Sequence, residues 1–408
     1  MTPYQLRFLK TSELAGALEM IGADPRSLPF FDNRRTLRIL FLPHIDVSAA
    51  NIIKQEMLSL GGDAAVNKHA IDCSAPFSDA LLFGTKKQLA MLADKIATMK
   101  WRGLPETADS VRAALAGLAA KEGGTEIPLP GGRALSRGGR TLIMGIVNLT
   151  DDSFYSESRT FGDADKALEM ALRLADEGAD IIDIGAESTR PGSHGTNESE
   201  ELSRMSTAVK KIRSALPGMP LSADTTRASV ARAALEEGAD IVNDISGLAR
   251  DTDIAATAAK FGAAYVLTHM RGTPETMRDQ CSYDNLLTDI SNFFSEGIKK
   301  AQGFGLERSS IILDPGIGFA KNYNQNLFLL RSLNAFDIFG LPILIGASRK
   351  STIGRATGSE SPNDRLEGTL AVTSLCAWHG VDIVRVHDAA ANKKAVMMVE
   401  AIKGALYE

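Results

Sequence analysis

Hydrophobic and polar positions alternate in a repeating order along the C-terminal part of the chain. Short aliphatic runs are each followed by a longer stretch whose apolar residues recur every three or four positions, a pattern typical of strand–helix units around a parallel sheet. The runs that predict strands are residues 141–149, 179–185, 220–224, 240–244, 264–269, 310–314, 342–348 and 382–387. These eight strands, each followed by a plausible helix, predict an α/β fold of the closed (β/α)8 barrel type, since a doubly wound sheet usually has fewer strands.

The first part of the chain predicts a small α/β domain at residues 1–120. Residues 36–42 and 79–85 have the pattern of strands, and the segments VSAANIIKQEMLSLGG and KKQLAMLADKIATM have that of helices. No Gly-rich phosphate loop or ligand cluster occurs there, and His44 and His69 stand alone, which favours a structural role for both. Two hypotheses remain open: an interaction or regulatory domain, or a structural extension that packs on the barrel and supports dimer assembly.

A change of composition separates the two parts. Residues 121–133, KEGGTEIPLPGGR, combine Gly, Pro and mixed charges, and the apolar periodicity lapses there. This composition predicts a linker. Residues 134–408 then remain for the barrel, a length that suits a fold of about 250 residues.

Composition and charge are those of a globular protein with no bias toward nucleic acid. Apolar residues make up 44% and charged residues 23% of the 408 positions, which excludes a wholly disordered or fibrous chain. The formal net charge of −5 gives no electrostatic reason to bind a polyanion. No apolar run approaches the roughly 20 residues of a transmembrane helix, and the first residues lack the apolar core of a signal peptide.

The cysteines and histidines argue against two kinds of zinc site. Cys73, Cys281 and Cys376 are far apart and odd in number, and the six histidines show no H-x-x-x-H spacing. A disulfide framework, a zinc–thiolate site and a zinc protease are therefore not favoured. The cysteine pattern fits a reducing compartment, so we expect a cytoplasmic protein.

Polar residues stand at the C-terminal end of every predicted barrel strand, where the active site of this fold lies. One such residue is usually a helix cap, and Asp244 and Asp388 fit that role, but eight polar strand ends are hard to explain by capping alone. Asp224, Asn243 and Asp314 supply acceptors and an amide, which suit a flat heterocycle with N–H donors and a carbonyl on one edge.

Cationic and neutral donors complete this inventory. Lys350 adds a donor for a ring nitrogen or carbonyl. The groups suited to phosphate, diphosphate or carboxylate oxygens are Arg190, Arg349, Arg385 and His387. Asn148 is a neutral oxygen ligand for Mg²⁺ if phosphates provide the other ligands. No Ser or Cys nucleophile is paired with a base, so ionisation of a diphosphate leaving group fits better than covalent catalysis.

The strand-end motifs together resemble those of the dihydropteroate synthase family. The segments that carry the resemblance are IMGIVNLTDDSF, DIGAESTRPG, SADT, VNDISG, THMRGTPETM, ILDPGIGFAK, GASRKS and VRVHD. Each is weak evidence alone, but the ordered series is specific, and ESTRPG, GASRKS and RVHD are its most diagnostic parts. The resemblance implies a transferase of folate biosynthesis that joins 6-hydroxymethyl-7,8-dihydropterin diphosphate to p-aminobenzoate and releases pyrophosphate.

The resemblance also implies roles for individual residues. The positions that hold the pterin are Asp224, Asn243, Asp314 and Lys350. Arg385 and His387 match positions that bind the diphosphate, with Asn148 near Mg²⁺. The p-aminobenzoate pocket matches Thr189, Arg190, Pro191, Phe319 and Ser351. We accordingly expect Lys350, Asp224, Asp314, Arg385 and His387 to act in catalysis. A homodimer through the last helices is expected by resemblance only.

The sequence departs from the family pattern in two loops. After the first barrel strand, Asp151 replaces a Pro of the family pattern. The Asp-Gly-Gly that follows in that pattern is missing, and Glu157 is an acidic residue in the same part of the loop. In the loop after the sixth strand, Ile317 replaces a Phe and Ala320 replaces a Gly. The first change leaves open how that loop closes over substrates, and Ala320 alters the backbone freedom of the second loop or narrows the acceptor pocket.

Three alternatives remain beside the synthase. A pterin-binding methyltransferase barrel would share the pterin acids but would not need ESTRPG and SRK, which are intact here. A p-aminobenzoate analogue is an alternative acceptor. A non-catalytic pterin-binding protein is supported only by the altered first loop. Among single residues, Asp183 is expected to be a buried structural acid, and His269 is left open between structure and catalysis.

Overall fold

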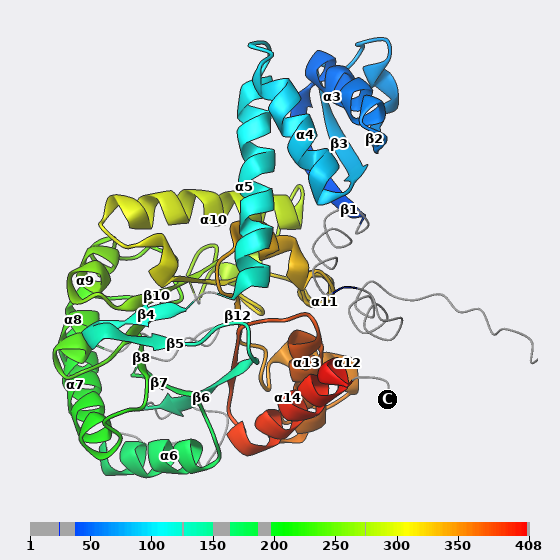
Figure 1. The fold of residues 1–408 in the computed structure, drawn as a ribbon. Coiled ribbons are helices and arrows are strands. Elements are labelled where there is room, and N and C mark those ends of the chain that lie inside the picture. Colours follow the sequence, from blue (N-terminus) through cyan, green and yellow to red (C-terminus); the bar gives the residue numbers. More distant parts are fainter. Residues whose placement is uncertain are drawn as a thin grey trace, which may run out of the picture. The chain divides into compact units, whose positions relative to one another are not determined.

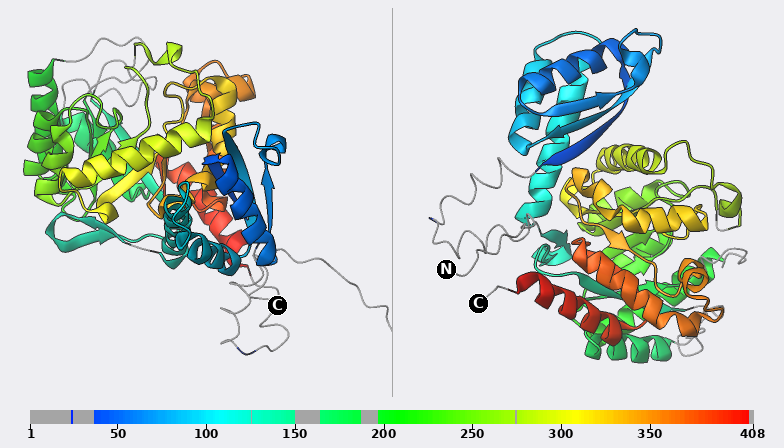
Figure 2. Two further views of the ribbon diagram at one scale, coloured as in Figure 1. Left: turned by 90° about the horizontal axis from the view of Figure 1, so that it is seen from above. Right: turned by 90° about the vertical axis from the view of Figure 1, so that its right-hand side faces the viewer.

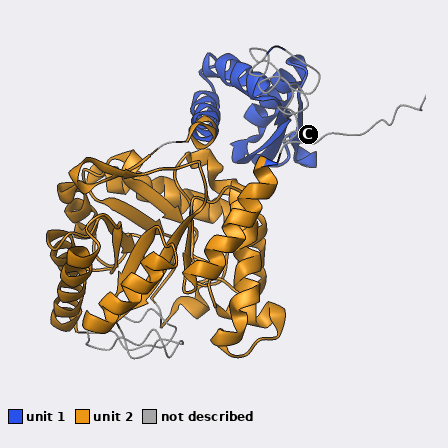
Figure 3. Cartoon of the chain, turned by 60° about the horizontal axis from the view of Figure 1, so that its bottom comes forward, with its two compact units in different colours: residues 1–118, 405–408 blue, residues 119–404 orange. Residues whose placement is uncertain are grey.

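The protein divides into two compact units, residues 1–118 with 405–408 and residues 119–404 (Figure 3). This computed structural model describes residue 24 and residues 37–124, 126–149, 164–186, 197–273 and 275–405. Each unit has a hydrophobic core of its own. The domain limits expected at residues 120 and 134 stay predictions.

The N-terminal unit is a three-stranded antiparallel sheet, in the order β1-β3-β2, with helices packed on it. Its elements are β1 (Arg38–Asp46), α3 (Val47–Ser59), β2 (Asp63–Val66), β3 (Phe77–Gly84), α4 (Lys86–Ala97) and α5 (Leu104–Gly123). Ile53, Leu92 and Val111, one from each helix, are fully buried in its core with Leu82 of the central strand. The expected small α/β domain is confirmed.

Capping residues mark where two of these helices begin. The carboxylate of Asp46 accepts the backbone N–H of Ser48 at 2.9 Å, so α3 begins directly after β1. Thr85 and Gln88 form a reciprocal capping box at the start of α4. The sequence analysis did not predict β2 or α5.

The C-terminal unit is the expected barrel, with helices on the outside of a ring of parallel strands (Figures 1 and 2). Its strands are β6 (Leu142–Asn148), β7 (Ile181–Gly185), β8 (Leu221–Asp224), β9 (Ile241–Asp244), β10 (Ala264–Thr268), β11 (Ile311–Asp314), β12 (Leu344–Ile345) and β13 (Ile383–Val386). Its helices are α6 (Ala164–Asp176), α7 (Glu198–Ala215), α8 (Ala228–Glu236), α9 (Asp253–Phe261), α10 (Leu286–Gly303), α11 (Tyr323–Arg331), α12 (Ser351–Thr357), α13 (Leu366–Trp378) and α14 (Ala389–Gly404). All eight expected strands are present, so this prediction is confirmed.

The ring of strands is closed by its weakest pairing. The ladder runs β11-β10-β9-β8-β7-β6-β13-β12, and a parallel bridge between Leu313 and Ile343 joins its two ends. The N–H of Leu313 donates to the carbonyl of Pro342 at 2.8 Å. Closure matters for function because it brings the C-terminal ends of all eight strands to one rim.

The described residues of the segment predicted to be a linker contain regular secondary structure, and its role as a linker stays a prediction. Residues 121–133 contain the last turn of α5, strand β4 (Ile127–Leu129) and the start of strand β5 (Arg133–Leu135), which pairs with β4 in an antiparallel hairpin. Ile127, Leu129 and Leu135 are buried together with the first residues of the barrel strands, among them Ile181 and Ile241. The hairpin therefore covers the N-terminal end of the barrel. The Gly and Pro residues that suggested a linker form its turn.

Three aspartates repeat one arrangement at this N-terminal end of the barrel. Asp180, Asp240 and Asp382 each stand directly before a strand and accept a backbone N–H from the neighbouring chain segment. The donors are Ile143 (2.8 Å), Leu221 (2.9 Å) and Ile343 (2.9 Å), respectively. Each carboxylate also pairs with arginine: Arg140 with Asp180, Arg133 and Arg213 with Asp240, and Arg137 with Asp382. Asp180 and Asp240 follow Gly-Ala in the sequence and Asp382 follows Gly-Val, and all three are paired structural acids.

Within the residues that the structure describes, no helix combines the length and the apolar character needed to cross a bilayer. The cytoplasmic location inferred from the cysteines stays a prediction.

Replacing Asp382 with Asn tests the arrangement at the barrel base. Asp382 accepts Arg137 Nε at 2.7 Å and Lys121 Nζ at 2.8 Å, and both partners are largely buried. Loss of the charge leaves these cations poorly compensated, so we expect a loss of about 3 kcal/mol in unfolding free energy. Thermal unfolding measures it. Asp165→Asn, which breaks an exposed pair with Lys211, is the control and should cost less than about 1 kcal/mol of unfolding free energy. Equal losses of stability in both variants would contradict the structural role of Asp382.

Candidate active site

Four strands bring a buried ionic network together at the C-terminal end of the barrel. Arg385 on β13 donates from Nε to Asp183 Oδ2 and from Nη2 to Asp224 Oδ2, both at 2.6 Å. Asn243 on β9 donates from Nδ2 to both carboxylate oxygens of Asp183, at 3.3 and 3.4 Å. Asp183 is completely buried, so its carboxylate fixes both the guanidinium and the amide. The structural role expected for Asp183 agrees with this geometry.

Burial and charge oppose each other in this network. Burial raises the pKa of Asp224 to about 7, against the lowering effect of Arg385, and Asp183 raises it further. Burial alone would lower the pKa of Arg385, but Asp183 and Asp224 together hold it above its ordinary value. Arg385 is therefore a permanent cation, and burial disfavours the negative charge that Asp224 carries beside it.

A second group of residues lies around Asp314 and Lys350. Asp314 ends β11 and accepts the N–H of Gly316 at 2.7 Å. Lys350 donates from Nζ to the carbonyl of Ile317 at 2.5 Å, and Nζ lies 4.5 Å from the centre of the Phe319 ring. The loop after β11 thus supplies both a carbonyl and an aromatic face to Lys350.

Electrostatic coupling joins the two groups into one site. Burial lowers the pKa of Lys350 to about 8, while Asp314 raises it and Arg385 lowers it. Burial raises the pKa of Asp314, and Lys350 lowers it. The structure therefore brings together five of the predicted residues, Asp224, Asn243, Asp314, Lys350 and Arg385, with Phe319 beside them.

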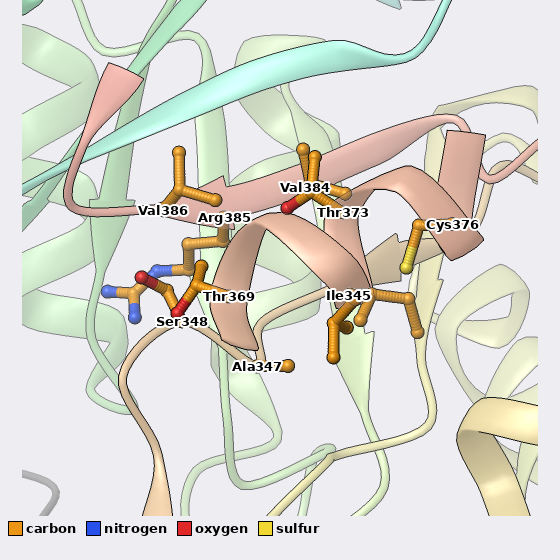
Figure 4. Close-up of a pocket in the computed structure, with 10 residues that line it drawn as sticks. Ile345, Ala347, Ser348, Thr369, Thr373, Cys376, Val384, Arg385 and Val386 are labelled. Carbon is orange, nitrogen blue, oxygen red and sulfur yellow. The ribbon is translucent and has the colours of Figure 1, made fainter. Parts of the chain in front are cut away.

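Arg349 follows β12 and His387 follows β13, but the surroundings of the two side chains differ. His387 Nδ1 lies 3.0 Å from Ser348 Oγ, next to a small cavity with room for about a water molecule (Figure 4). Arg385 and Ser348 line that cavity together with apolar residues of α13, β12 and β13. Arg349, predicted among the anion-binding cations, is tied to Asp388 by two bonds of 2.6 and 3.0 Å, which explains its burial without a ligand.

The remaining predicted residues are placed less centrally or not described. Asn148 ends β6; a Cβ on Gly185 would lie 3.6 Å from both Asn148 Oδ1 and an oxygen of Asp224, which puts the amide beside the ionic network. Ser351 begins α12 and is exposed. Thr189, Arg190 and Pro191 lie outside the described residues, as does the altered loop that contains Asp151 and Glu157.

Two buried residues at this rim received no firm role from the sequence. His269 Nδ1 lies 2.9 Å from Lys321 Nζ, and both side chains are almost inaccessible to solvent. Burial lowers the pKa of His269 to about 2, with Lys321 acting in the same direction, so this imidazole stays neutral at ordinary pH. That favours the structural interpretation of His269. Nothing in the sequence indicated that Lys321, seven residues after the end of β11, is buried.

Ala320 takes a left-handed conformation, with φ of 49°. The family pattern has Gly at this position, which adopts such angles at little cost, whereas a residue with a Cβ is strained there. The carbonyl of Ala320 accepts the hydroxyl of Tyr283 at 2.9 Å. Ala320 therefore holds a left-handed conformation at the cost of local strain.

Comparison with known proteins agrees with this geometry. Residues 144–387 match the family model described as pterin binding enzyme. The dihydropteroate synthase of Synechocystis is 44% identical over 276 residues, which covers 67% of this chain and 95% of that protein. This chain belongs to the dihydropteroate synthase family.

Two further members of the family extend the comparison. The crystal structure of dihydropteroate synthase from Xanthomonas albilineans with 4-aminobenzoic acid is 36% identical, with a TM-score of 0.63, and the match covers 69% of this chain and 100% of that one. A Helicobacter pylori protein named bifunctional dihydropteroate synthase/dihydropteroate reductase is 34% identical over 382 residues, or 93% of this chain and 94% of that protein. This last similarity extends into the N-terminal unit.

The pKa of Lys350 predicts an alkaline limit to activity. The value falls from 10.5 to about 8, so the cationic form is lost as the pH rises through about 8. We expect kcat/KM for a pterin substrate, which reports ionisations of the free enzyme, to fall above this pH. Lys350→Arg keeps a cation at every accessible pH, so its profile, although lower, should stay level between pH 8 and 10. The same decline in both proteins would exclude Lys350 as its source.

Proposed function

We propose that this chain is a dihydropteroate synthase that joins 6-hydroxymethyl-7,8-dihydropterin diphosphate to p-aminobenzoate. The observation that carries the proposal is the set of buried acceptors at one end of the barrel, Asp224, Asn243 and Asp314, with the partly buried Lys350 beside them, in a chain of this family. Catalysis here consists of holding a heterocycle, stabilising a leaving diphosphate and admitting an aromatic amine.

The pterin is bound by exchange of hydrogen-bond partners. A pterin edge presents N–H groups and a carbonyl, which match the carboxylates of Asp224 and Asp314, the amide of Asn243 and the ammonium of Lys350. Arg385 occupies one oxygen of Asp224 in this structure. A bound pterin that donates to Asp224 frees Nη2 of Arg385, while Nε keeps its bond to Asp183.

The departing diphosphate then meets fixed positive charge. The freed N–H groups of Arg385 and the imidazole of His387 stabilise the negative charge that grows as the C–O bond breaks. Asp224 and Asp314 are complementary to the cation that develops on the pterin methylene carbon. The amine nitrogen of p-aminobenzoate, which is neutral at pH 7, forms the new C–N bond and releases its proton to solvent.

Magnesium is proposed as the cofactor of the diphosphate. The donor chemistry fits a substrate-held ion: Asn148 offers a neutral amide oxygen, and the described residues contain no group of three or more acidic, His or Cys side chains able to hold a metal. The diphosphate must then supply most ligands, as is usual for Mg²⁺. When bound, the ion neutralises charge on the leaving group.

Pyrophosphate release is the direct test of this function. With the pterin diphosphate and Mg²⁺, we expect release that requires p-aminobenzoate, fails in EDTA, and falls by at least about 10³-fold in Lys350→Ala, which loses a charge that acts on the reacting groups. Lys403→Ala, on α14, is the matched control and should keep full activity. Tight pterin binding with no acceptor-dependent release would reject the synthase; release with p-aminobenzoate analogues alone would identify a different acceptor.

We also propose a homodimer through the last two helices. Trp378 on α13 and Met397, Met398 and Ile402 on α14 are each at least half exposed. Exposed apolar groups gathered on neighbouring helices are typical of subunit interfaces. Light scattering should give twice the chain mass at micromolar concentration, and Met398→Glu should shift it toward the monomer. A wild-type protein that stays monomeric at 50-fold higher concentration would exclude the dimer.

A dihydropteroate reductase is a second candidate activity. The supporting observation is that similarity to the protein named for both activities spans 93% of this chain, whereas the Synechocystis synthase matches 67%. The reaction adds a hydride and a proton across the C=N bond of 7,8-dihydropteroate and oxidises a reduced nicotinamide or flavin. It would give the N-terminal unit a catalytic role, in contrast to the two alternatives, an interaction domain and a structural extension.

Absorbance at 340 nm separates these alternatives for the N-terminal unit. Purified protein is mixed with 7,8-dihydropteroate and NADPH, with and without added flavin. Oxidation of NADPH that depends on dihydropteroate supports the reductase. Its absence under both conditions, in protein that releases pyrophosphate, would leave the synthase as the sole activity of the two.

A further inference from the structure

Lys321 is a buried cation that the synthase mechanism does not use. Lys321 stands at the end of the loop after β11, and the residue is 7% exposed. Nζ lies within hydrogen-bonding distance of four acceptors: His269 Nδ1 at 2.9 Å and the carbonyls of Phe319 (2.9 Å), Gly316 (3.1 Å) and His269 (3.4 Å). Such a fully surrounded ammonium organises main chain, because it has no surface left for a ligand.

Lys321 binds the carbonyls of Gly316 and Phe319 in the loop after β11 and the carbonyl of His269 directly after β10, and this loop packs tightly against the end of β10. Gly316 has φ of +71°, and a Cβ there would lie 2.1 Å from the carbonyl oxygen of His269, so only glycine fits. From another side, Asn326 Oδ1 accepts the N–H of Gly318 at 2.7 Å. The ammonium of Lys321 thus lies inside the loop after β11, and the backbone of this loop packs directly on the end of β10.

The same loop carries the groups that face Lys350. The carbonyl of Ile317 and the ring of Phe319 both contact Lys350. The loop carbonyls that bind Lys321 come from the same short stretch of chain. Phe319 has its carbonyl on Lys321 and its ring beside the site. A shift of this peptide would therefore move the ring, whereas Lys350 is also held by the charge of Asp314 and by its place at the start of α12.

Charged groups of both signs act on Lys321. Burial lowers the pKa of Lys321 to about 7, Asp314 raises it, Lys350 and Arg271 lower it, and Cys281 raises it. His269 stays neutral and accepts a hydrogen bond from Lys321. The charged groups facing Lys321 thus come from β11, α12 and the segment after β10.

We infer that Lys321 is a positioning residue for the acceptor side of the site, setting the height of the Phe319 ring through the main chain of residues 316–319. The inference rests on the proposed synthase function, in which Phe319 borders the p-aminobenzoate pocket. Lys321 touches no reacting atom. It acts by fixing the loop against His269.

Lys321→Met is the variant that tests this inference, because Met keeps the apolar stem and removes the ammonium. We expect the KM for p-aminobenzoate to rise by about tenfold or more, since displacement of a substrate-positioning group by a fraction of an ångström has effects of this size. The KM for the pterin diphosphate should change by less than about threefold. Lys121→Met removes a partly buried lysine from the opposite end of the barrel and should leave both constants unchanged.

A second variant and a second readout guard against loss of folding and against failure of the parent proposal. His269→Phe keeps the ring packing against Phe293 and removes one acceptor, so it should raise the same KM to a smaller extent. Amide hydrogen exchange in residues 315–321 should become faster in Lys321→Met without any substrate.

Each result decides one question. An active wild type with an unchanged KM for p-aminobenzoate in both variants overturns the inference, as does unchanged exchange of the loop. Equal rises in both KM values also overturn it, since they indicate general disorder of the site. A wild type that releases no pyrophosphate rejects the synthase function, and the exchange measurement then tests the loop by itself.

Discussion

The guanidinium of Arg385, held between two buried carboxylates, is the interaction on which the rest of the site depends. It links β13 to β7 and β8 across the inside of the barrel, and through Asp183 it fixes the amide of Asn243. A buried ion pair of this kind contributes little net stability, because desolvation offsets most of the attraction. Its contribution is geometric, since it fixes Asp183, Asp224 and Asn243 relative to one another.

The two ends of the barrel use the same residue types for opposite purposes. At the N-terminal end, Asp180, Asp240 and Asp382 each accept a backbone N–H and pair with arginine, so their hydrogen-bonding capacity is largely used within the protein. At the C-terminal end, Asp224 and Asp314 are buried but retain oxygen positions that a ligand can take. Such incompletely satisfied acids shift their pKa values, and those shifts mark functional sites.

The sequence predicted those parts of the molecule whose pattern is local. The eight barrel strands are continuous aliphatic runs buried on both faces, and the polar residue at each strand end follows from the fold itself. Strand β2 was missed because DAAV has no extended apolar run, and the hairpin that begins within residues 121–133 was missed because its Gly and Pro residues are also typical of a linker. The partners of Arg349 and Lys321 could not be predicted, because Asp388 and His269 are distant in sequence.

The hairpin β4–β5 changes where the catalytic half of this protein begins. Ile127 and Leu129 belong to the core at the barrel base, and Lys121, still within α5, donates to Asp382. A gene fragment that started at residue 131 would encode all eight barrel strands and yet lack part of the floor beneath them. The boundary between the two compact units lies within α5, between Leu118 and Ala119. One residue inserted into that helix would turn each side chain that follows it by about 100° around the helix axis.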